Sequence, residues 1–309
     1  MFRRFIDRWR RLFQSVDRVE AHLSKIAALL AAAEARNADS AEFIRARLQQ
    51  MDLHLARLEH QTALSHPRFA SPKRLEAYGR QVFSQNDEDG IIAEIFRRIG
   101  EGGRVFVEIA AGDGRVNCSA YLLSQGWRGL WVECDEAKCS SIQAAWPEQL
   151  ASGQLQLSRA FVKTDTVNDL IARAKLGDEI DLFIMDIDGN DYHVLKALEV
   201  KPRVICAEYY APRPPPDRWV MPYDENFSLD LSKAWEVGAS LQALDDLLTP
   251  RGYSLVGTNI AGVNAFFVRN DCVSDKFEAP FTAVNHYNPS RYWYSNLALK
   301  SPIWTLPRD

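Results

Sequence analysis

The stretch that decides the fold runs from Val105 to Gly114 and reads Val-Phe-Val-Glu-Ile-Ala-Ala-Gly-Asp-Gly. A short apolar run that ends in an acid and a glycine turn is typical of a buried parallel strand whose carboxyl end meets a small-molecule pocket. Gly112 and Gly114 let the backbone approach a ligand closely, because no Cβ stands in the way. A second acid, Glu133, ends the next apolar run, 129–132, where it is placed to hydrogen-bond a ribose diol. The two acids and the turn predict a nucleoside-containing cofactor.

The spacing of these residues separates two classes of cofactor. A dinucleotide site requires G-x-G-x-x-G, and Asn117 stands where the third glycine would be. The E-x-G-x-G-x-G pattern of S-adenosylmethionine enzymes fits better, with Glu108 followed by Ala110, Gly112 and Gly114, so that alanine replaces the first glycine. An acid at the end of a strand also suits the ammonium and sulfonium charges of S-adenosylmethionine. Taken by itself, the motif is also compatible with a tight strand-to-helix turn that holds no ligand.

The bulk composition narrows the class of protein. The chain has 309 residues, 47% of them hydrophobic and 25% charged, with a net charge of -4, which is typical of a globular protein of one large or two modest domains. This charge is less basic than a nucleic-acid-binding protein usually requires. No apolar run approaches the roughly 20 residues of a membrane span, and arginines interrupt the first apolar stretches, which argues against a secretory signal. The five cysteines form no C-x-x-C pair and predict a reduced, cytoplasmic protein.

Residues 2–62 contain no glycine and no proline, which predicts a helical region. Apolar residues recur there at alternating steps of three and four, the pattern of a coiled-coil seam, and they predict self-association. Asn37 and Ser40 interrupt the seam, so that one long helix with a register slip and a helical hairpin both remain open. The seam comprises Phe2, Phe5, Trp9, Leu12, Val16, Val19, Leu23, Ile26, Leu30 and Ala33, and then Ile44, Leu48, Met51, Leu55 and Leu58.

The first turns of this region combine five arginines, at positions 3, 4, 8, 10 and 11, with aromatic residues. A basic helix with an apolar aromatic face suits an anionic membrane surface, here the inner face of the cell membrane. The alternative is that the arginines are simply solvated beside the seam. Residues 63–74 contain two prolines and predict a linker between the helical region 1–62 and a catalytic domain 75–309.

From residue 75 onward, strand and helix patterns alternate. This alternation predicts an α/β fold: a Rossmann-like, doubly wound, mostly parallel sheet with helices on both faces, preceded by the coiled-coil helix. Ligands in such sheets bind outside the carboxyl ends of the strands. The expected strands are 104–109, 129–133, 154–162, 181–186 and 203–208, with a terminal pair at 253–257 and 265–269. The expected helices are 89–99, 119–125, 138–149, 166–174, 192–198 and 239–248.

The densest polar cluster is 185–193, Met-Asp-Ile-Asp-Gly-Asn-Asp-Tyr-His. Neighbouring carboxylates raise one another's pKa or share a metal ion. Glu208, at the end of the adjacent strand, is expected to join Asp186 and Asp188 around Mg²⁺ or Mn²⁺, and His193 is a candidate general base. The alternatives are that Asp188 or Asp191 caps a helix and that His193 is an ordinary helix residue.

Several segments together resemble the class I S-adenosylmethionine-dependent methyltransferases, and most nearly the FkbM-like branch, which is often found near glycan and natural-product biosynthesis. The segments are 84–85, 88–90, 107–114, 126–129, 186–192, 208–209, 238–241 and 262–268. The resemblance implies methyl transfer to an oxygen. It also implies a cofactor site lined by Gln85, Glu108, Gly112, Asp113, Gly114 and Glu133, with Asp186 near the methyl group.

These observations predict an S-adenosylmethionine-dependent O-methyltransferase that acts on a sugar hydroxyl of a glycan or lipid-linked polysaccharide. A sugar hydroxyl is a very weak acid and needs a placed base or a cation, for which Asp186, Asp188, His193 and Glu208 are the candidates. The proline-rich run 211–223 is expected to cover the pocket or to form a rigid surface loop. The alternatives are a catalytically silent scaffold or chain-length ruler, a small-molecule (natural-product) O-methyltransferase and a nicotinamide oxidoreductase.

Overall fold

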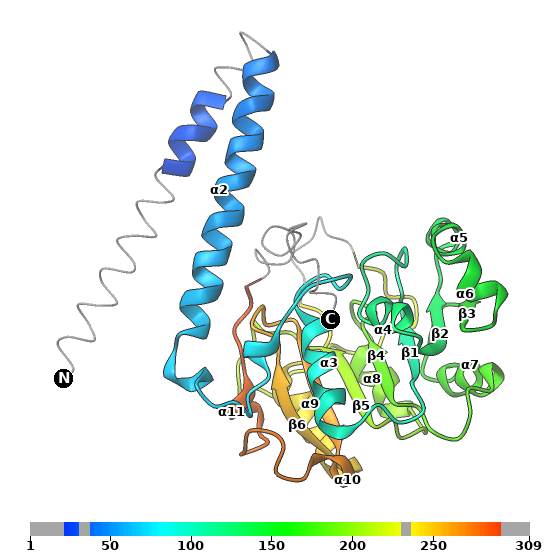
Figure 1. Cartoon of the computed structure of the whole chain (residues 1–309). Coiled ribbons are helices and arrows are strands. Elements are labelled where there is room, and N and C mark those ends of the chain that lie inside the picture. Colours follow the sequence, from blue (N-terminus) through cyan, green and yellow to red (C-terminus); the bar gives the residue numbers. More distant parts are fainter. Residues whose placement is uncertain (1–21, 31–37, 230–235, 292–309) are drawn as a thin grey trace. The chain divides into compact units, whose positions relative to one another are not determined.

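A computed structural model describes residues 22–30, 38–229 and 236–291, in two compact units, Met1–Leu55 and Ala56–Asp309. Residues 22–30 are helical, and α2 spans Ala38–Leu64 (Figure 1). The basic face at residues 1–13 and the join at 31–37 lie outside the described residues, so the choice between a long helix and a hairpin stays open. The coiled coil also stays a prediction; in the single chain, Met51 and Leu58 of its seam are exposed. No described helix is long and apolar enough to cross a membrane.

The second unit contains a seven-stranded sheet in the order β3-β2-β1-β4-β5-β7-β6. Strands β1 to β5 are parallel, and β7 runs antiparallel between β5 and β6. The predicted α/β fold with a mostly parallel sheet is therefore confirmed. The strands are β1 Val105–Ile109, β2 Arg128–Glu133, β3 Leu155–Arg159, β4 Leu182–Met185, β5 Val204–Glu208, β6 Tyr253–Thr258 and β7 Asn264–Arg269.

The six expected helices lie at the expected positions, with one of them divided in two, and the short helices α10 and α11 were not expected. The helix expected at 138–149 is two helices, because Pro147 has no N–H with which to continue a helix and instead begins a new one. The α-helices after α2 are α3 Glu88–Ile99, α4 Ala120–Ser124, α5 Glu136–Ala145, α6 Pro147–Ala151, α7 Val167–Ala174, α8 Asp191–Ala197, α9 Leu241–Leu248, α10 Asn270–Val273 and α11 Ala283–His286. Short 3-10 turns are η1 Pro67–Phe69, η2 Glu76–Tyr78 and η3 Thr249–Arg251.

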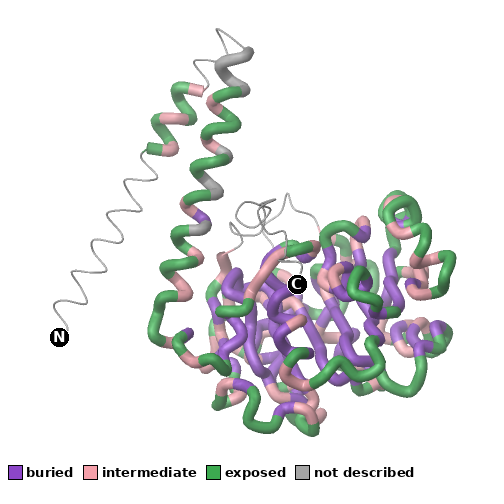
Figure 2. Tube along the Cα trace, in the orientation of Figure 1, coloured by how far each residue is buried: buried purple, intermediate pink, exposed green. Residues whose placement is uncertain are grey.

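Apart from the edge strand β3, the strands are buried along most of their length, and much of the tube through the second unit is purple in Figure 2. Side chains alternate across a strand, so Val107 of β1 joins the apolar layer beneath α7, α8 and α9, whereas Phe106 joins the layer beneath α3, α4 and α5. This arrangement explains why the strands read as continuous apolar runs, because a parallel sheet covered on both faces exposes neither. The neighbouring strands β1 and β2 also approach closely where Gly129 pairs with Phe106, since a Cβ on Gly129 would lie 2.2 Å from the Phe106 carbonyl oxygen.

The strand order reverses at β1, which lies between β2 and β4. The chain leaves β1 toward β2 and β3 on one side, then crosses to β4 and β5 on the other. In open α/β sheets, the crevice at such a reversal, outside the carboxyl ends of the strands, is where ligands bind. The residues that follow β1, β2, β4 and β5 therefore form the candidate site.

Candidate functional site

The turn after β1 has an unusual backbone. Ala110, Gly112 and Gly114 all have positive φ, at 61°, 63° and 73°. Glycine adopts this conformation without strain, whereas alanine does not, so Ala110 is a strained position. The two glycines differ in their surroundings: a Cβ on Gly112 would meet no atom within 4 Å, whereas a Cβ on Gly114 would lie 2.9 Å from Ile142 Cγ1. Gly112 therefore borders open space, and Gly114 is part of the packing.

Glu108, at the end of β1, is held by the protein itself. Its carboxylate accepts hydrogen bonds from Asn117 Nδ2 at 2.7 Å, the Cys118 N–H at 2.8 Å and the Ser119 N–H at 3.1 Å. The Ser119 hydroxyl also donates to it, and Trp131 Nε1 donates to that hydroxyl at 2.7 Å. Burial raises the pKa of Glu108. Glu108 thus holds the start of α4, and Asn117, which stands in place of the third glycine, is one of its partners.

Glu133, at the end of β2, is likewise paired with backbone groups. Its Oε2 accepts from the Gly112 N–H at 2.9 Å, and its Oε1 accepts from the N–H groups of Cys134 and Asp135, each at 2.9 Å. The structure therefore places Glu133 directly against the glycine turn. A carboxylate oxygen has two lone pairs, so Oε2 can still accept one bond from a ligand. The ribose contact stays a prediction.

Gln85 and Asp113 complete the predicted cofactor set. The side chain of Gln85 is exposed, while its backbone carbonyl accepts from Gln81 Nε2 at 2.9 Å. Its loop lies beside the turn after β1, because the ring of Phe83 packs 5.9 Å from that of Trp146, whose Nε1 donates to the Gly114 carbonyl at 2.8 Å. Asp113 Oδ1 accepts from the Arg115 N–H at 3.0 Å. The structure thus brings the segments of the predicted cofactor site to one edge of the sheet.

Three acids meet at the ends of β4 and β5, where Asp186, Asp188 and Glu208 each offer a carboxylate oxygen within 4.8 Å of the others. Burial, together with the charges of the neighbouring acids, raises the pKa of Asp186 and of Glu208. Because these carboxyl groups lie so close together, each disfavours the ionised form of the other. Burial raises the pKa of Asp188, against the opposing charge of Lys138. We call Asp186, Asp188 and Glu208 the acidic trio.

Asp191, the next acid after Asp188, has a structural role. Asp191 accepts from the N–H groups of Ile187 and Gly189, at 2.8 and 2.9 Å, and so it holds the turn between β4 and α8. Asp188 is in that turn with a φ of 59°, a conformation that costs energy for a residue with a Cβ. Asp191 therefore fixes the backbone turn that carries Asp188.

His193 lies on α8 next to the acidic trio in the sequence, but it faces a backbone carbonyl. Its Nε2 is 2.7 Å from the Met221 carbonyl oxygen, so Nε2 carries the proton and donates it. Only Nδ1 is then left to accept a proton from a substrate. The role of His193 as general base remains a prediction, and the structure adds a positioning contact for which the sequence carries no signal.

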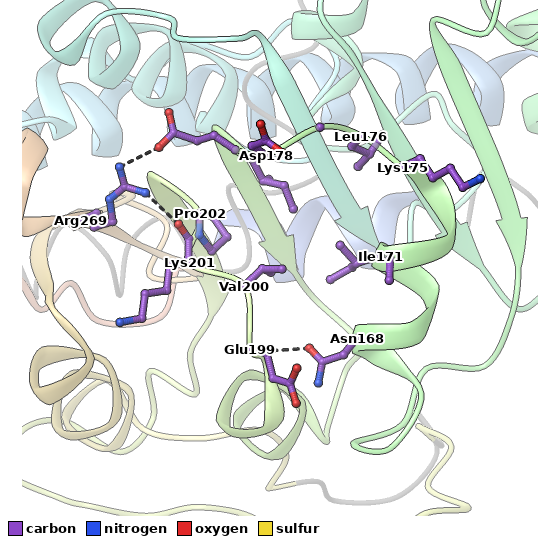
Figure 3. A pocket seen from close by; sticks show the side chains of 14 residues that line it. Asn168, Ile171, Lys175, Leu176, Asp178, Glu199, Val200, Lys201, Pro202 and Arg269 are labelled. Atoms are coloured by element: carbon purple, nitrogen blue, oxygen red, sulfur yellow. Dashed lines mark hydrogen bonds and ion pairs between the residues drawn. The ribbon is translucent and has the colours of Figure 1, made fainter.

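The described residues also line a cavity of about 440 Å³ at the opposite edge of the sheet (Figure 3). It lies between the end of α7 and the segments that lead into β4 and β5, with Ile171, Leu176 and Val200 among its apolar residues. At its side, Arg269 pairs with Glu179 at 2.8 Å and donates to the Lys201 carbonyl at 3.0 Å. None of the predicted site residues lines this cavity.

No family model matches the chain, and no curated protein sequence matches it. Among solved structures, the N-terminal domain of EvdMO1, in the presence of SAH and D-fucose, is 13% identical and covers 69% of this chain and 95% of its own, with a TM-score of 0.39. CalS10, an amino pentose methyltransferase from Micromonospora echinaspora, is 14% identical and covers 60% and 92%, also at 0.39. The magnesium protoporphyrin IX methyltransferase ChlM from Synechocystis PCC 6803 is 14% identical and covers 69% and 97%, at 0.35. The structural similarity to S-adenosylmethionine-dependent methyltransferases is therefore distant.

Proposed function

We propose that this chain is an S-adenosylmethionine-dependent O-methyltransferase that acts on a sugar hydroxyl of a glycan or lipid-linked polysaccharide. The observation that carries the proposal is the acidic trio at the carboxyl ends of β4 and β5, on the same edge of the sheet as the turn that follows β1. In open α/β sheets, ligands bind at the edge where the strand order reverses. When bound, S-adenosylmethionine supplies a methyl group on a positively charged sulfur, and a group of carboxylates favours such a cation.

The residues of this edge fit that ligand. Gly112 borders open space, so the backbone can lie against a nucleoside without a Cβ between them. Glu133 is held against the same turn through its bond to the Gly112 N–H, with one lone pair of Oε2 still free for a hydroxyl group. Glu108 positions α4 and the turn before it, and we assign it a supporting part rather than a direct contact.

Asp186 and Glu208 are the groups best suited to take the proton of an acceptor hydroxyl. Because their pKa values are raised, the unprotonated member of the pair is a stronger base than an ordinary carboxylate. The acceptor oxygen forms the new bond to the methyl carbon as the carbon–sulfur bond breaks, and its proton passes to this carboxylate. Asp186, Asp188 and Glu208 are also the residues that would hold Mg²⁺ or Mn²⁺, which would stabilise the developing negative charge on the oxygen.

Calorimetric titration of the full-length protein with S-adenosylmethionine, and separately with NAD, tests the cofactor. We expect binding of the first and none of the second, and the reverse result would refute the proposal in favour of an oxidoreductase. Mass spectrometry of surface glycans from cells with and without the protein then tests the reaction, with a difference of one methyl group expected. Binding without any such difference would favour the scaffold, and a methylated small molecule would favour a natural-product enzyme. Activity that is indifferent to EDTA would remove the metal.

We further propose that the N-terminal region mediates self-association through a coiled coil. We also propose that it contacts the anionic inner face of the cell membrane. The support for this part is the heptad spacing of the region and the arginines around its first aromatic residues. Binding to phosphatidylglycerol-containing vesicles is expected to be lost when residues 1–13 are deleted. Unchanged vesicle binding would remove the membrane contact and leave the methyltransferase proposal untouched.

A further inference from the structure

Residues 217–227 form a segment, here called the strap, that is bonded along one side to the residues before α9. The Ser240 N–H donates to the Trp219 carbonyl, and the Met221 N–H donates to the Gly238 carbonyl, each at 2.9 Å. Val220 forms an isolated bridge with Ala239 between these two bonds. The strap is therefore an ordered piece of backbone, although its composition shows no strand or helix pattern.

The other side of the strap is held by the turn and helix that follow Asp188. Asn190 Nδ2 donates to the Asp224 carbonyl at 2.6 Å, and the Asp224 N–H donates back to Asn190 Oδ1 at 3.3 Å. His193 Nε2 donates to the Met221 carbonyl at 2.7 Å. Three side-chain bonds from two residues thus hold the strap, and we call Asn190 and His193 the latch.

The strap also packs directly on the residue after Asp188. A Cβ on Gly189 would lie 2.5 Å from the ring of Phe227, so only a glycine leaves room for that ring. Farther out, Glu225 of the strap lies 3.7 Å from Lys163, which follows β3. The strap therefore passes along the carboxyl edge of the sheet next to the acidic trio, where an acceptor for a reaction at these carboxylates has to enter.

One side chain of the strap is suited to contact that acceptor. Tyr223 packs its ring 5.4 Å from the ring of His193, with 65° between the two planes, and it remains 40% exposed. His193 thus holds both the backbone at Met221 and the orientation of the Tyr223 ring. An oriented, part-exposed aromatic ring offers an apolar face, which matches the apolar C–H face of a sugar ring.

We propose that the Asn190–His193 latch holds the strap beside the acidic trio, and that Tyr223 is the wall against which the sugar ring of the acceptor stacks. This inference rests on the proposed function for the identity of the acceptor, but the latch itself does not. His193 is then a positioning residue, acting through Met221 and Tyr223.

Hydrogen exchange of the full-length protein, followed by mass spectrometry, tests the latch without any substrate. In N190A and H193A, the backbone amides of residues 221–227 are expected to exchange about tenfold faster or more, since each variant loses bonds that hold this backbone. H193Q retains a side-chain N–H donor of similar reach and is expected to exchange nearly as the wild type does. The matched control is N168A, because Asn168 makes the same two-bond clasp elsewhere, to the Ala197 carbonyl and the Glu199 N–H, each at 2.9 Å.

Unchanged exchange of residues 221–227 in N190A and H193A would overturn the latch. Equal acceleration there in N168A would also overturn it, because the effect would then be a general loosening. Circular dichroism identifies a variant that fails to fold, and the remaining member of the pair N190A and H193A then decides.

Methyl transfer from radiolabelled S-adenosylmethionine to a panel of methyl glycosides tests the stacking wall. We expect H193A, N190A and Y223A to raise the KM for the glycoside about tenfold or more with S-adenosylmethionine affinity unchanged, and Y223F and H193Q to retain the wild-type KM. If H193Q instead loses kcat as H193A does, with KM unchanged, His193 is the base and the positioning role is wrong. If the wild type binds no S-adenosylmethionine, the proposed function and the stacking wall fail together, while the exchange experiment still decides the latch.

Discussion

Replacing Glu108 by glutamine tests whether this acid has a structural role or contacts the cofactor directly. Glutamine keeps the shape of the side chain but turns one acceptor oxygen into an N–H donor. In the better of its two orientations, the amide oxygen takes the place of Oε2 and keeps the donors Asn117 and Ser119. The amide nitrogen then faces the Cys118 N–H, which donates to Oε1 at 2.8 Å in the wild type. One buried donor is left facing another donor.

The cost of E108Q follows from this geometry. Losing a hydrogen bond to a charged acceptor costs roughly 1.5–3 kcal/mol, and leaving a buried N–H without a partner costs about 1–3 kcal/mol. Relief from burying a charge, the same burial that raises the pKa of Glu108, offsets part of this sum. We expect the free energy of unfolding to fall by about 2–4 kcal/mol, which lowers the Tm of a domain of this size by roughly 4–16 °C.

Thermal unfolding and calorimetric titration with S-adenosylmethionine are measured on the same preparation. The expected result is a lower Tm with S-adenosylmethionine affinity reduced less than about tenfold, or by less than about 1.4 kcal/mol. The control is D113N, since Asp113 is only half-buried and its change is expected to stay within about 0.5 kcal/mol. An unchanged Tm together with an affinity reduced a hundredfold would refute the reasoning, because Glu108 would then be a cofactor ligand.

Three further outcomes are expected. Because burial and neighbouring acids raise the pKa of Asp186 and Glu208, the folded chain binds more protons than the unfolded one above the ordinary carboxyl pKa, and stability falls as pH rises through the raised values. E208Q should therefore show a smaller loss of Tm than the wild type between pH 5 and pH 8, and an equal loss would contradict the raised pKa values. G114A should lower Tm more than G112A, since only the Cβ at 114 meets Ile142 and Trp131. G112A should instead weaken S-adenosylmethionine binding, because its Cβ would enter the open space beside the turn. Addition of MnCl₂ should raise the Tm at pH 8 in the wild type but not in D188N, and no rise in the wild type would remove the metal site.

The acidic trio shows which features of a site the local sequence pattern can predict. Asp186 and Glu208 each end an apolar run, so local pattern alone predicts their place at the ends of strands. That the two strands are neighbours in the sheet, with Met185 paired to Ala207, is decided by long-range pairing. The sequence indicates that these acids meet only because parallel strands deliver their carboxyl ends to one edge.

Other contacts have no local signal. In the sequence, Asn117 is notable only because it stands where a dinucleotide motif has its third glycine. Its bond to Glu108 depends on how the chain returns after the turn. Asp191 is one of several neighbouring acids, yet its bonds to Ile187 and Gly189 hold the turn. The chemistry of His193 makes it a candidate base, while its Nε2 meets a carbonyl 28 residues away. Each of these roles depends on the partner and not on the residue type.

The amino-acid sequence is sufficient to predict where the seven strands lie, where the glycine turn follows β1 and which acids end the strands, because these features follow from apolar periods and backbone preferences within a few residues. The strand order, the pairing of Glu108 and Glu133 with backbone donors, and the holding of the strap by Asn190 and His193 emerge only in the folded chain. Those features depend on which distant segments pack together, and the free energy that selects them comes from burial and hydrogen bonding summed over the whole core.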